Sequence, residues 1–535
     1  MKQGKIRRHP ATLQVIMERG RRVTLIPLAL GLLFGVLAVG DVAYANTITI
    51  NSLSDTGSAG VCVLRDAITA ANSKAAVNAC AAGSGNDTVV FESGLTGTIT
   101  LGSQLPDVLN ALTINGPDTN PVAITIDGGG KNEFLVVNSG ATLNLRNLTF
   151  AHSGGNEALQ NLGTMSVANC TFANNTAGSG TILNDNTLSV ANSTFSGNSA
   201  AAGGGAGGGI LNNDTLNVTN STFSGNSAAA GGAILNNGTL SVTNGTFSGN
   251  SASGAGGAIY NDGAANIKGT ILSSSTSGGN CAGTITNDGY NISDDGTCGF
   301  GTGTGANGQT IGDNVNPNLD AAGLANNGGP TQTIALQSTS AAVDAIPFAA
   351  CTFPAGTLNP CTNPPAMTSS DQLTCDQRGE PRPDPEDGAD GACDIGAYEL
   401  QAATTTPFAR FRPVLLIDLP QYFLLQGTLA LAASSPALDP VAEIVTITLS
   451  SKSLTPVSLT IPAGSFKKLF GQYVFRGKVG SVNVFALITS QFKNGYGFLI
   501  EADGLSLAGI SNPVTATLQV GSDSGTKNVR AFIIQ

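Results

Sequence analysis

A repeat of 22 to 28 residues in the middle of the chain limits its possible folds more than any other feature. Apolar and polar residues alternate within each copy, which indicates short strands separated by Gly, Asn and Ser turns. A strand-based repeat of this length predicts a solenoid, here a right-handed parallel β-helix with one coil of three short strands per repeat. We expect a column of stacked rings inside it, continued by Ile271. The rings belong to Phe150, Phe172, Phe195, Phe223 and Phe247.

One coil of this kind is too small to fold by itself. Burying its Phe, Ile, Leu and Val side chains contributes about 6–12 kcal/mol, at about 1.5–3 kcal/mol each. Ordering roughly 24 residues costs more than that, at about 1–2 kcal/mol per residue. Stability therefore has to come from stacked coils about 4.8 Å apart, which share buried contacts and backbone hydrogen bonds.

Asparagine recurs at three positions of the repeat. It tolerates left-handed turn conformations, and its amide can bond to the next coil. We interpret the columns as structural ladders, with direct ligand binding as the alternative. The first ladder consists of Asn175, Asn198, Asn226 and Asn250. A second column contains Asn169, Asn192, Asn220 and Asn244, and a third contains Asn184, Asn212, Asn236 and Asn261.

Charge is sparse and predominantly negative. Charged residues make up 11% of the chain, and 24 Lys and Arg stand against 35 Asp and Glu, for a formal net charge of -11. Such a chain has no basic face that could follow a phosphate backbone, so nucleic acid is not an expected partner. The hydrophobic share of 41% is too high for a charge-swollen disordered chain.

Residues 1–45 have the pattern of a secretory signal peptide. A basic start precedes an apolar stretch from Leu25 to Val39, and Ala43-Tyr44-Ala45 is a small-x-small cleavage site. The apolar stretch is about 15 residues long, whereas a membrane span needs about 20. We therefore expect cleavage, with a retained anchor as the alternative, and no transmembrane segment after it.

All nine cysteines follow Ala45, as expected for an oxidising compartment. Their spacing suggests local disulfides, although the sequence leaves the connectivity open. The suggested pairs are Cys62 with Cys80, Cys281 with Cys298, Cys351 with Cys361, and Cys375 with Cys393. Cys170 is left over, and we expect it to be a buried free thiol.

The repeats offer few groups for catalysis. Lys268 is the only basic residue between positions 147 and 377, and His152 is the only histidine after residue 45. We interpret His152 as a turn or surface residue. A glycosidase needs two carboxylates about 5–9.5 Å apart. Asp185 and Asp214 lie on adjacent coils, offset by one position, and could approach to within such a range. Asn or Gly takes their place in other coils, so we interpret both as turn residues.

One acidic stretch is a candidate metal site. Closely spaced carboxylates in a Gly-containing loop suit calcium, and the alternative is a solvated loop fastened by Cys375 and Cys393. The candidate ligands are Asp384, Glu386, Asp387 and Asp390. We expect no other cofactor.

Two motifs resemble those of known bacterial surface proteins. The segment from Phe223 to Asn226, followed by Gly231 to Ile234, resembles the repeats of polymorphic outer-membrane proteins, a family of surface β-helices used in adhesion. The segment from Cys62 to Ile68, followed by Ala70-Ala-Asn72, resembles the CSLREA motif that opens secreted β-helix proteins. Apolar residues at helical spacing in this segment predict a short amphipathic helix that caps the first coil.

A third resemblance covers the region downstream of the repeats. Four segments resemble a choice-of-anchor domain: Asn327 to Leu336, Ala342-Val-Asp344, Asp376-Gln-Arg-Gly379 with Arg382-Pro383, and Asp394 to Glu399. Such regions lie beside varied surface-attachment tails. The resemblance therefore implies that this part of the chain belongs to a surface protein.

These observations divide the chain into six parts. They are a signal peptide (1–45), an N-terminal cap (46–90), the parallel β-helix (91–320), a choice-of-anchor-like region (321–400), a linker (401–407) and a C-terminal domain (408–535). Alternating runs in the last part predict an antiparallel β-sandwich. The expected fold class is all-β, with a pectate-lyase-like solenoid followed by this sandwich.

We expect a non-catalytic protein that is secreted or associated with the outer membrane at the bacterial cell surface, and that is adhesin-like or part of the envelope. Its partner would be a cell-surface or matrix component, either a glycan or a protein. One alternative is a polysaccharide lyase or glycoside hydrolase, because the same fold carries such enzymes. The other alternative is a purely structural envelope spacer.

Overall fold

The computed structural model describes residues 46–534, apart from 201–206, 355–356, 363–365, 368–371, 385–390, 402–405 and positions 433, 434, 436, 453, 493 and 522. The predicted signal peptide, residues 1–45, lies outside the described residues and stays a prediction. Strands dominate the part of the chain that is described, and α1 (Leu64–Ser73) is its one α-helix. This helix is not long and apolar enough to cross a membrane.

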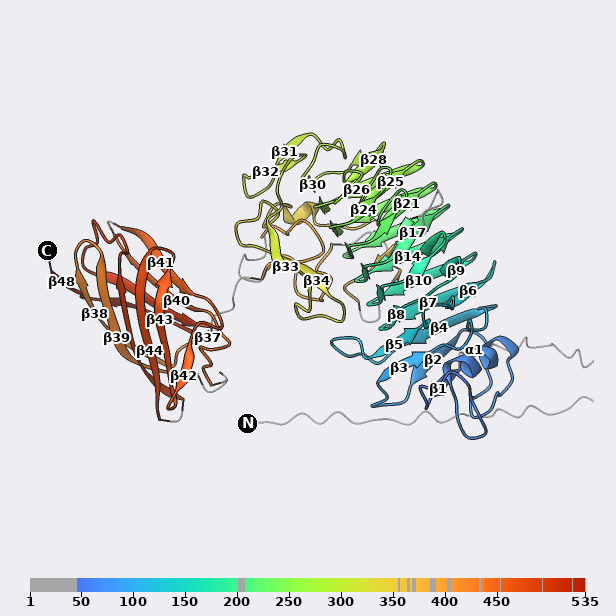
Figure 1. Ribbon diagram of the computed structural model, residues 1–535, viewed down its shortest axis with the longest axis horizontal. Helices are drawn as coiled ribbons and strands as arrows, with labels where there is room; N and C mark the ends of the chain where they lie inside the picture. Colours follow the sequence, from blue (N-terminus) through green and yellow to red (C-terminus); the bar gives the residue numbers. More distant parts are fainter. Residues whose placement is uncertain are drawn as a thin grey trace, which may run out of the picture. The chain divides into compact units, whose positions relative to one another are not determined.

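A parallel β-solenoid forms the first part of the structure and confirms the predicted fold class (Figure 1). Its first sheet has ten parallel strands, because each coil contributes one. In sheet order they are β1 (Thr47–Ile50), β2 (Asp87–Phe91), β4 (Ala111–Asn115), β7 (Thr142–Arg146), β10 (Thr164–Ala168), β14 (Thr187–Ala191), β18 (Thr215–Thr219), β22 (Thr239–Thr243), β26 (Ala264–Lys268) and β29 (Thr286–Asn287).

The second sheet of the solenoid has eleven strands and contains the phenylalanine column. It is parallel except at its end, where β31 and β32 form an antiparallel pair. Its strands are β3 (Gly97–Thr100), β5 (Ile124–Asp127), β8 (Thr149–Ala151), β11 (Thr171–Ala173), β15 (Thr194–Ser196), β19 (Thr222–Ser224), β23 (Thr246–Ser248), β27 (Ile271–Ser273), β30 (Ile292–Ser293), β32 (Thr310–Gly312) and β31 (Thr302–Thr304).

Two further sheets complete the coils. The third has seven strands, β6 (Leu135–Val137), β9 (Glu157–Asn161), β13 (Gly180–Asn184), β17 (Gly207–Asn212), β21 (Ile234–Asn236), β25 (Ile259–Asn261) and β28 (Cys281–Gly283). The fourth has four strands, β12 (Thr176–Ala177), β16 (Ser199–Ala200), β20 (Ser227–Ala228) and β24 (Ser251–Ala252). Four of the coils therefore contain four strands, where three were predicted. A strand of two residues is too short to produce an alternating pattern.

The predicted column of rings forms the centre of the solenoid core. From Phe150 to Phe247, successive rings are stacked with centroids 4.7 to 5.1 Å apart. The prediction for Ile271 is wrong by one residue, because Leu272 lies opposite Phe247 and Ile271 lies opposite Thr246. Side chains alternate along a strand, so Ile271 faces out of the solenoid, where a second core buries it.

The helix α1 covers the first coil, as its amphipathic pattern predicted. Leu64, Ala67, Ile68 and Ala71 are buried in the same core as the first strands. The Cys62–Cys80 disulfide lies in this region and has the expected pairing. The cap thus covers apolar side chains that the first coil would otherwise expose.

The residues that follow the solenoid fold back along it. They contain the antiparallel pair β33 (Leu319–Ala325) and β34 (Thr333–Leu336), the 3-10 helix η1 (Phe348–Ala350), and the antiparallel pair β35 (Leu358–Asn359) and β36 (Ala366–Met367). We call residues 328–401 the belt. Its Leu336, Ile346 and Ile395 share a hydrophobic core with the outward-facing Ile271 and Ile292 of the second sheet.

Two of the four expected disulfides in the chain are wrong, and both lie in the belt. The structure pairs Cys351 with Cys393 and Cys361 with Cys375, whereas neighbours along the chain were expected to pair. The backbone explains the outcome, because Ile346 and Cys393 exchange two hydrogen bonds and bring distant belt segments together. The Cys281–Cys298 disulfide has the expected pairing, and Cys170 is free and buried as predicted.

The C-terminal domain consists of two largely antiparallel sheets that share one hydrophobic core, as predicted for a sandwich. The five-stranded sheet has the order β37 (Thr406–Pro407), β47 (Asp523–Val529), β46 (Val514–Val520), β40 (Val445–Ser451) and β41 (Leu454–Ile461). The seven-stranded sheet has the order β42 (Lys467–Leu469), β43 (Gln472–Val479), β44 (Val482–Phe492), β45 (Gly495–Asp503), β39 (Tyr422–Ala430), β38 (Arg410–Asp418) and β48 (Phe532–Ile534).

Candidate functional site

The first asparagine column is a continuous buried ladder. Asn175, Asn198, Asn226 and Asn250 are all 0% exposed. Each of the first three donates from Nδ2 to Oδ1 of the next, over 3.0, 2.8 and 2.9 Å. The same Oδ1 atoms also accept backbone N–H groups from the neighbouring coil. These amides are fully occupied inside the protein, and the geometry therefore favours the structural role over ligand binding.

The third column repeats this arrangement at another corner of the coils. Asn184, Asn212 and Asn236 each donate from Nδ2 to the Oδ1 of the next asparagine, over 2.6 to 2.7 Å. The ladder also extends one coil further than predicted, because Asn161 donates to Asn184 over 2.7 Å. Two internal amide ladders thus hold the coils in register.

The side chains of the second column bond mainly to the belt rather than to one another. Asn169, Asn192, Asn220 and Asn244 have φ values of 46 to 54°, the left-handed turn conformation that asparagine tolerates. Asn169 bonds to the asparagine of the coil before it. The other three donate out of the solenoid to belt carbonyl oxygens: Asn192 to Pro360, Asn220 to Cys375 and Asn244 to Asp394, over 2.8 to 3.2 Å. These side chains attach the belt.

Buried ions hold the belt segments to one another. Arg378 lies 2.7 Å from the Asp376 carboxylate and Arg382 lies 2.8 Å from the Glu399 carboxylate, and all four side chains are almost fully buried. Burial raises the pKa of Asp394 to about 7, although two backbone N–H groups and Arg382 oppose that rise. Burial likewise raises the pKa of Glu399 well above its ordinary value.

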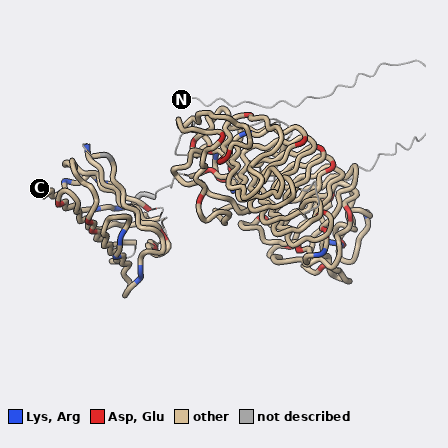
Figure 2. The backbone as a smooth tube through the Cα atoms, turned by 45° about the horizontal axis from the view of Figure 1, so that its top comes forward, with Lys and Arg blue, Asp and Glu red and all other residues tan. Residues whose placement is uncertain are grey.

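These residues belong to the motifs that resembled a choice-of-anchor domain, but the sequence alone did not show that they meet. One sequence feature could have pointed to these ion pairs. Asp, Arg and Glu gather in these motifs, whereas charged residues are sparse in the coils (Figure 2). Between them, Gln377 reaches the solenoid. It accepts a hydrogen bond from Thr222 over 2.6 Å and donates to Thr194 over 2.8 Å. The motif therefore has a structural explanation as a docking clamp.

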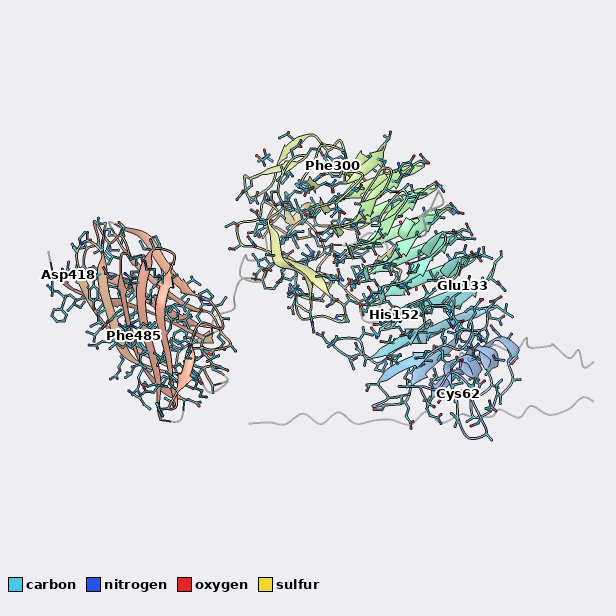
Figure 3. All side chains as sticks on the ribbon, viewed as in Figure 1. Cys62, Glu133, His152, Phe300, Asp418 and Phe485 are labelled. Carbon is cyan, nitrogen blue, oxygen red and sulfur yellow. A yellow bond between two sulfur atoms is a disulfide. The ribbon has the colours of Figure 1, made fainter. Side chains whose placement is uncertain are left out.

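His152 and Lys268, two of the groups considered for catalysis, each contact a neighbouring residue. His152, labelled in Figure 3, has a φ of 52° and lies at a turn of the solenoid. Its Nδ1 is 3.0 Å from the Asp127 carboxylate. Burial opposes ionisation of Asp127, but hydrogen bonds from His152 and Gly129 outweigh it and lower the pKa of the carboxyl. Lys268 donates to Thr352 over 2.9 Å, and burial lowers its pKa.

The two carboxylates considered for a glycosidase have turn roles. Asp185 accepts a hydrogen bond from the amide of Asn213 over 2.8 Å, and Asn213 in turn accepts one from Asn237 over 2.8 Å. Asp214 accepts a hydrogen bond from the neighbouring Thr215 over 3.0 Å. The strand register places Asp185 opposite Asn213 rather than Asp214. Asp185 therefore belongs to an exposed amide column at one corner of the solenoid.

The acidic stretch proposed for calcium is described only in part. Asp384 is buried at 3% exposure, whereas Glu386, Asp387 and Asp390 lie outside the described residues. Within the described ranges, no group of three or more His, Cys, Asp or Glu side chains is placed to hold a metal ion. The calcium site thus stays a prediction.

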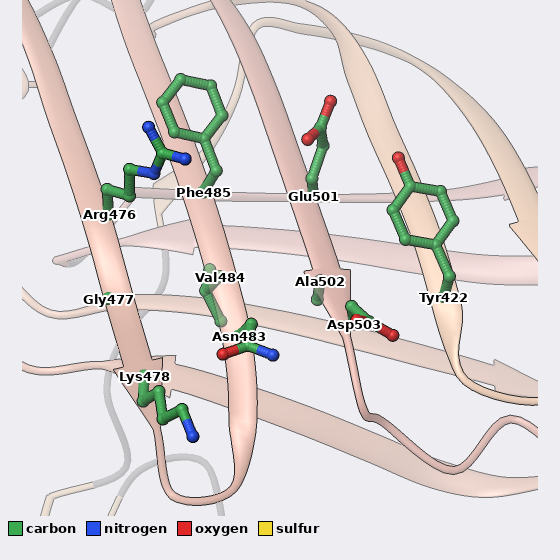
Figure 4. A pocket seen from close by; sticks show the side chains of 10 residues that line it. All are labelled: Tyr422, Arg476, Gly477, Lys478, Asn483, Val484, Phe485, Glu501, Ala502 and Asp503. Carbon is green, nitrogen blue, oxygen red and sulfur yellow. The ribbon is translucent and has the colours of Figure 1, made fainter.

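The outward face of the seven-stranded sheet contains a shallow depression of about 450 Å³ (Figure 4). Phe485 lies opposite Arg476 on one side and Glu501 on the other. Tyr422 and Asp503 lie opposite each other in the adjacent row. Burial raises the pKa of the Tyr422 phenol, and the Glu501, Asp418 and Asp503 carboxylates add to that shift. The depression combines aromatic rings with hydrogen-bonding groups of both charges.

A comparison with known protein families matches a short segment of the chain. Residues 244–262 match the repeat of the Chlamydia polymorphic membrane protein family. This segment includes β23, the ladder residue Asn250 and β25. The match therefore covers parts of the two coils where the ring stack and the amide ladders run. No curated protein and no solved structure matches the chain.

Proposed function

We propose that this protein is a non-catalytic, adhesin-like scaffold at the bacterial cell surface. The observation that carries the proposal is the solenoid, whose amide ladders and stacked rings satisfy their polar and apolar groups internally. Coils of this kind supply stiffness and length, and the matched repeat is that of a membrane-protein family. Secretion through residues 1–45 belongs to the same proposal.

The depression on the C-terminal domain is the binding surface in this proposal. Aromatic rings supply contact area at low entropic cost, and the flanking Arg476, Glu501 and Asp503 supply hydrogen bonds, a combination that suits a glycan or a polar protein surface. An enzyme on the solenoid is less well supported, because Asp185 and Asp214 are engaged in turns and His152 is paired with Asp127.

Location is tested first, by fractionating the producing bacterium and treating whole cells with a protease. The proposal expects the chain in the surface fraction, and a chain confined to the cytoplasm would refute it. Binding is tested next, by adding purified protein to panels of glycans and matrix proteins. Phe485→Ser should reduce capture at least tenfold. The reason is that a phenylalanine side chain buried by the bound partner contributes about 1.5–3 kcal/mol to the binding free energy.

Thr446→Ala is the matched control, because Thr446 lies on the other sheet of the same domain, where its hydroxyl is 3.3 Å from that of Thr460. Capture unaffected by Phe485→Ser would move the binding surface elsewhere. A deletion strain with altered surface layers and normal adherence would favour the envelope spacer. Release of reducing ends or unsaturated sugars from a polysaccharide panel would favour an enzyme.

A further inference from the structure

The hairpin of β42 and β43 ends in a turn that exposes large apolar side chains. Phe470 is 105% exposed and Leu469 is 50% exposed. Phe470 has a φ of 51° and Gly471 a φ of 78°. A two-residue turn with both residues in this region normally carries Asn-Gly, and bulky residues are rare there. The backbone of Phe470 therefore has a conformation that is unfavourable for a bulky residue. Its ring does not pack on any described part of the chain.

Cations surround this tip. Lys467 and Lys468 precede it on β42 and are exposed. The strand pairings run from Leu469 through Gln472, Thr489, Gly497 and Thr428 to Arg412, so Arg412 lies at the same end of the sheet. The carboxylates of Asp418, Glu501 and Asp503 lie at the opposite end of the strands by the same register. Arg476 and Lys478 also lie there, so that end has mixed charge, whereas the described charged residues of the sheet at the end with the exposed ring are all basic. We call this second end the basic end.

The charge of the whole domain agrees with this polarity. Residues 408–535 contain 10 Lys and Arg against 6 Asp and Glu, for a net charge of +4, whereas residues 46–407 contain 7 against 27, for a net charge of -20. Two acidic residues of the other sheet, Asp439 and Glu443, lie near Tyr496 and Tyr473 at the basic end. Charge alone is therefore a modest attraction, and the exposed ring has to supply the remaining contact.

We propose that this tip is a lipid anchor, in which Phe470 and Leu469 insert into a bilayer whose anionic headgroups are bound by Lys467 and Lys468. An apolar group inserted at the headgroup boundary and flanked by basic residues is the arrangement that holds peripheral proteins on anionic membranes. The tip lies at the other end of the strands from the depression that contains Phe485 and Glu501. Insertion at one end therefore leaves the other end free.

The test uses sedimentation of the full chain with vesicles of phosphatidylcholine, with or without about one third phosphatidylglycerol. We expect binding only to the anionic vesicles and weaker binding in high salt. Phe470→Ser should weaken binding at least about tenfold, and Lys467→Gln or Lys468→Gln should each weaken it about fivefold. Phe532→Ser is the matched control, because Phe532 is 69% exposed on β48, at the opposite edge of the same sheet.

A second measurement reports insertion directly. The chain contains no tryptophan, so Phe470→Trp introduces a single fluorescent reporter at a site where no packing is lost. Its emission should shift to shorter wavelength with anionic vesicles and be quenched by brominated lipid tails, whereas Phe532→Trp should show neither effect. Loss of binding on removal of the lysines but not of Phe470 would indicate surface charge or anionic polysaccharide binding, and would overturn the proposal. So would unshifted emission of Phe470→Trp.

This inference does not depend on the proposed adhesin-like function. Failure of vesicle binding would leave the surface location, measured by fractionation, unaffected. Conversely, finding the protein in another cell fraction would not change whether the purified chain binds these vesicles. The two proposals therefore fail on different measurements.

Discussion

Replacing Asn198 with alanine tests whether the buried amides hold the coils together. The Asn198 amide donates to Asn226 Oδ1 over 2.8 Å and to the Phe172 carbonyl over 3.0 Å. Its Oδ1 accepts from both the backbone N–H and the side-chain amide of Asn175, over 3.1 and 3.0 Å. Alanine removes all four bonds from a site that is 0% exposed.

The four losses are unequal. The Asn175 amide keeps its bond to the Phe150 carbonyl, and Asn226 Oδ1 keeps its bond from the Asn198 backbone. The Asn175 backbone N–H is left without this acceptor in a buried position, which costs about 1–3 kcal/mol. The three other bonds contribute about 0.5–1 kcal/mol each, so we expect a loss of about 2.5–6 kcal/mol in the free energy of unfolding.

The assay is urea unfolding followed by far-ultraviolet circular dichroism, because the chain has no tryptophan. Repeat arrays can unfold in more than one step, so the midpoint of the solenoid transition is the quantity to compare. Asn213→Ala is the control, since its exposed amide belongs to the outer column and its loss should cost less than about 0.5 kcal/mol. Equal midpoints for the two variants would refute the argument that the buried ladder stabilises the stack.

Three further predictions use other parts of the chain. Peptide mapping without reduction should find Cys351 joined to Cys393, and a peptide joining Cys351 to Cys361 would contradict the structure. The Cys170 thiol, whose pKa burial raises to about 12, should resist iodoacetamide in the folded protein and react after denaturation, whereas rapid labelling of the native chain would contradict its burial. Burial also raises the pKa of Asp394 to about 7, so the folded state binds this proton more tightly than the unfolded state. The contribution of Asp394 to stability should then be greatest below about pH 4 and be lost as the pH rises to about 7. Thermal melts of the protein and of Asp394→Asn over this range measure that contribution as the difference in slope, and equal slopes would exclude Asp394 as a source.

The repeats made the solenoid predictable, because every coil has to bury its own ring and bond its own amides. The register failed at Ile271, where the repeat signature is lost and two adjacent apolar residues follow each other. Leu272 faces the solenoid core, and Ile271 faces the belt core. Period-two alternation cannot choose between them when both faces of a strand are covered.

The belt was less predictable, because its contacts join residues far apart in the sequence. Asn220 and Cys375, for example, are separated by 155 positions, and no period connects them. The same folding back explains why spacing alone misassigned the disulfides of Cys351 and Cys375. The exposure of Phe470 could not be predicted either, because the sequence does not show whether a single phenylalanine beside two lysines is buried.

The outward bonds of the second asparagine column restrict how this protein can change in length. Asn192, Asn220 and Asn244 meet carbonyl oxygens at fixed places on a separate strap of chain. Duplicating a coil between them would add one attachment point without a matching acceptor and would displace those beyond it. The belt is also attached near the first coils, because Asn120 donates to the Gly328 carbonyl and the Val122 N–H donates to the Pro330 carbonyl. Growth is therefore tolerated more readily before residue 120. Related proteins of different length should therefore gain or lose coils near the N-terminal end.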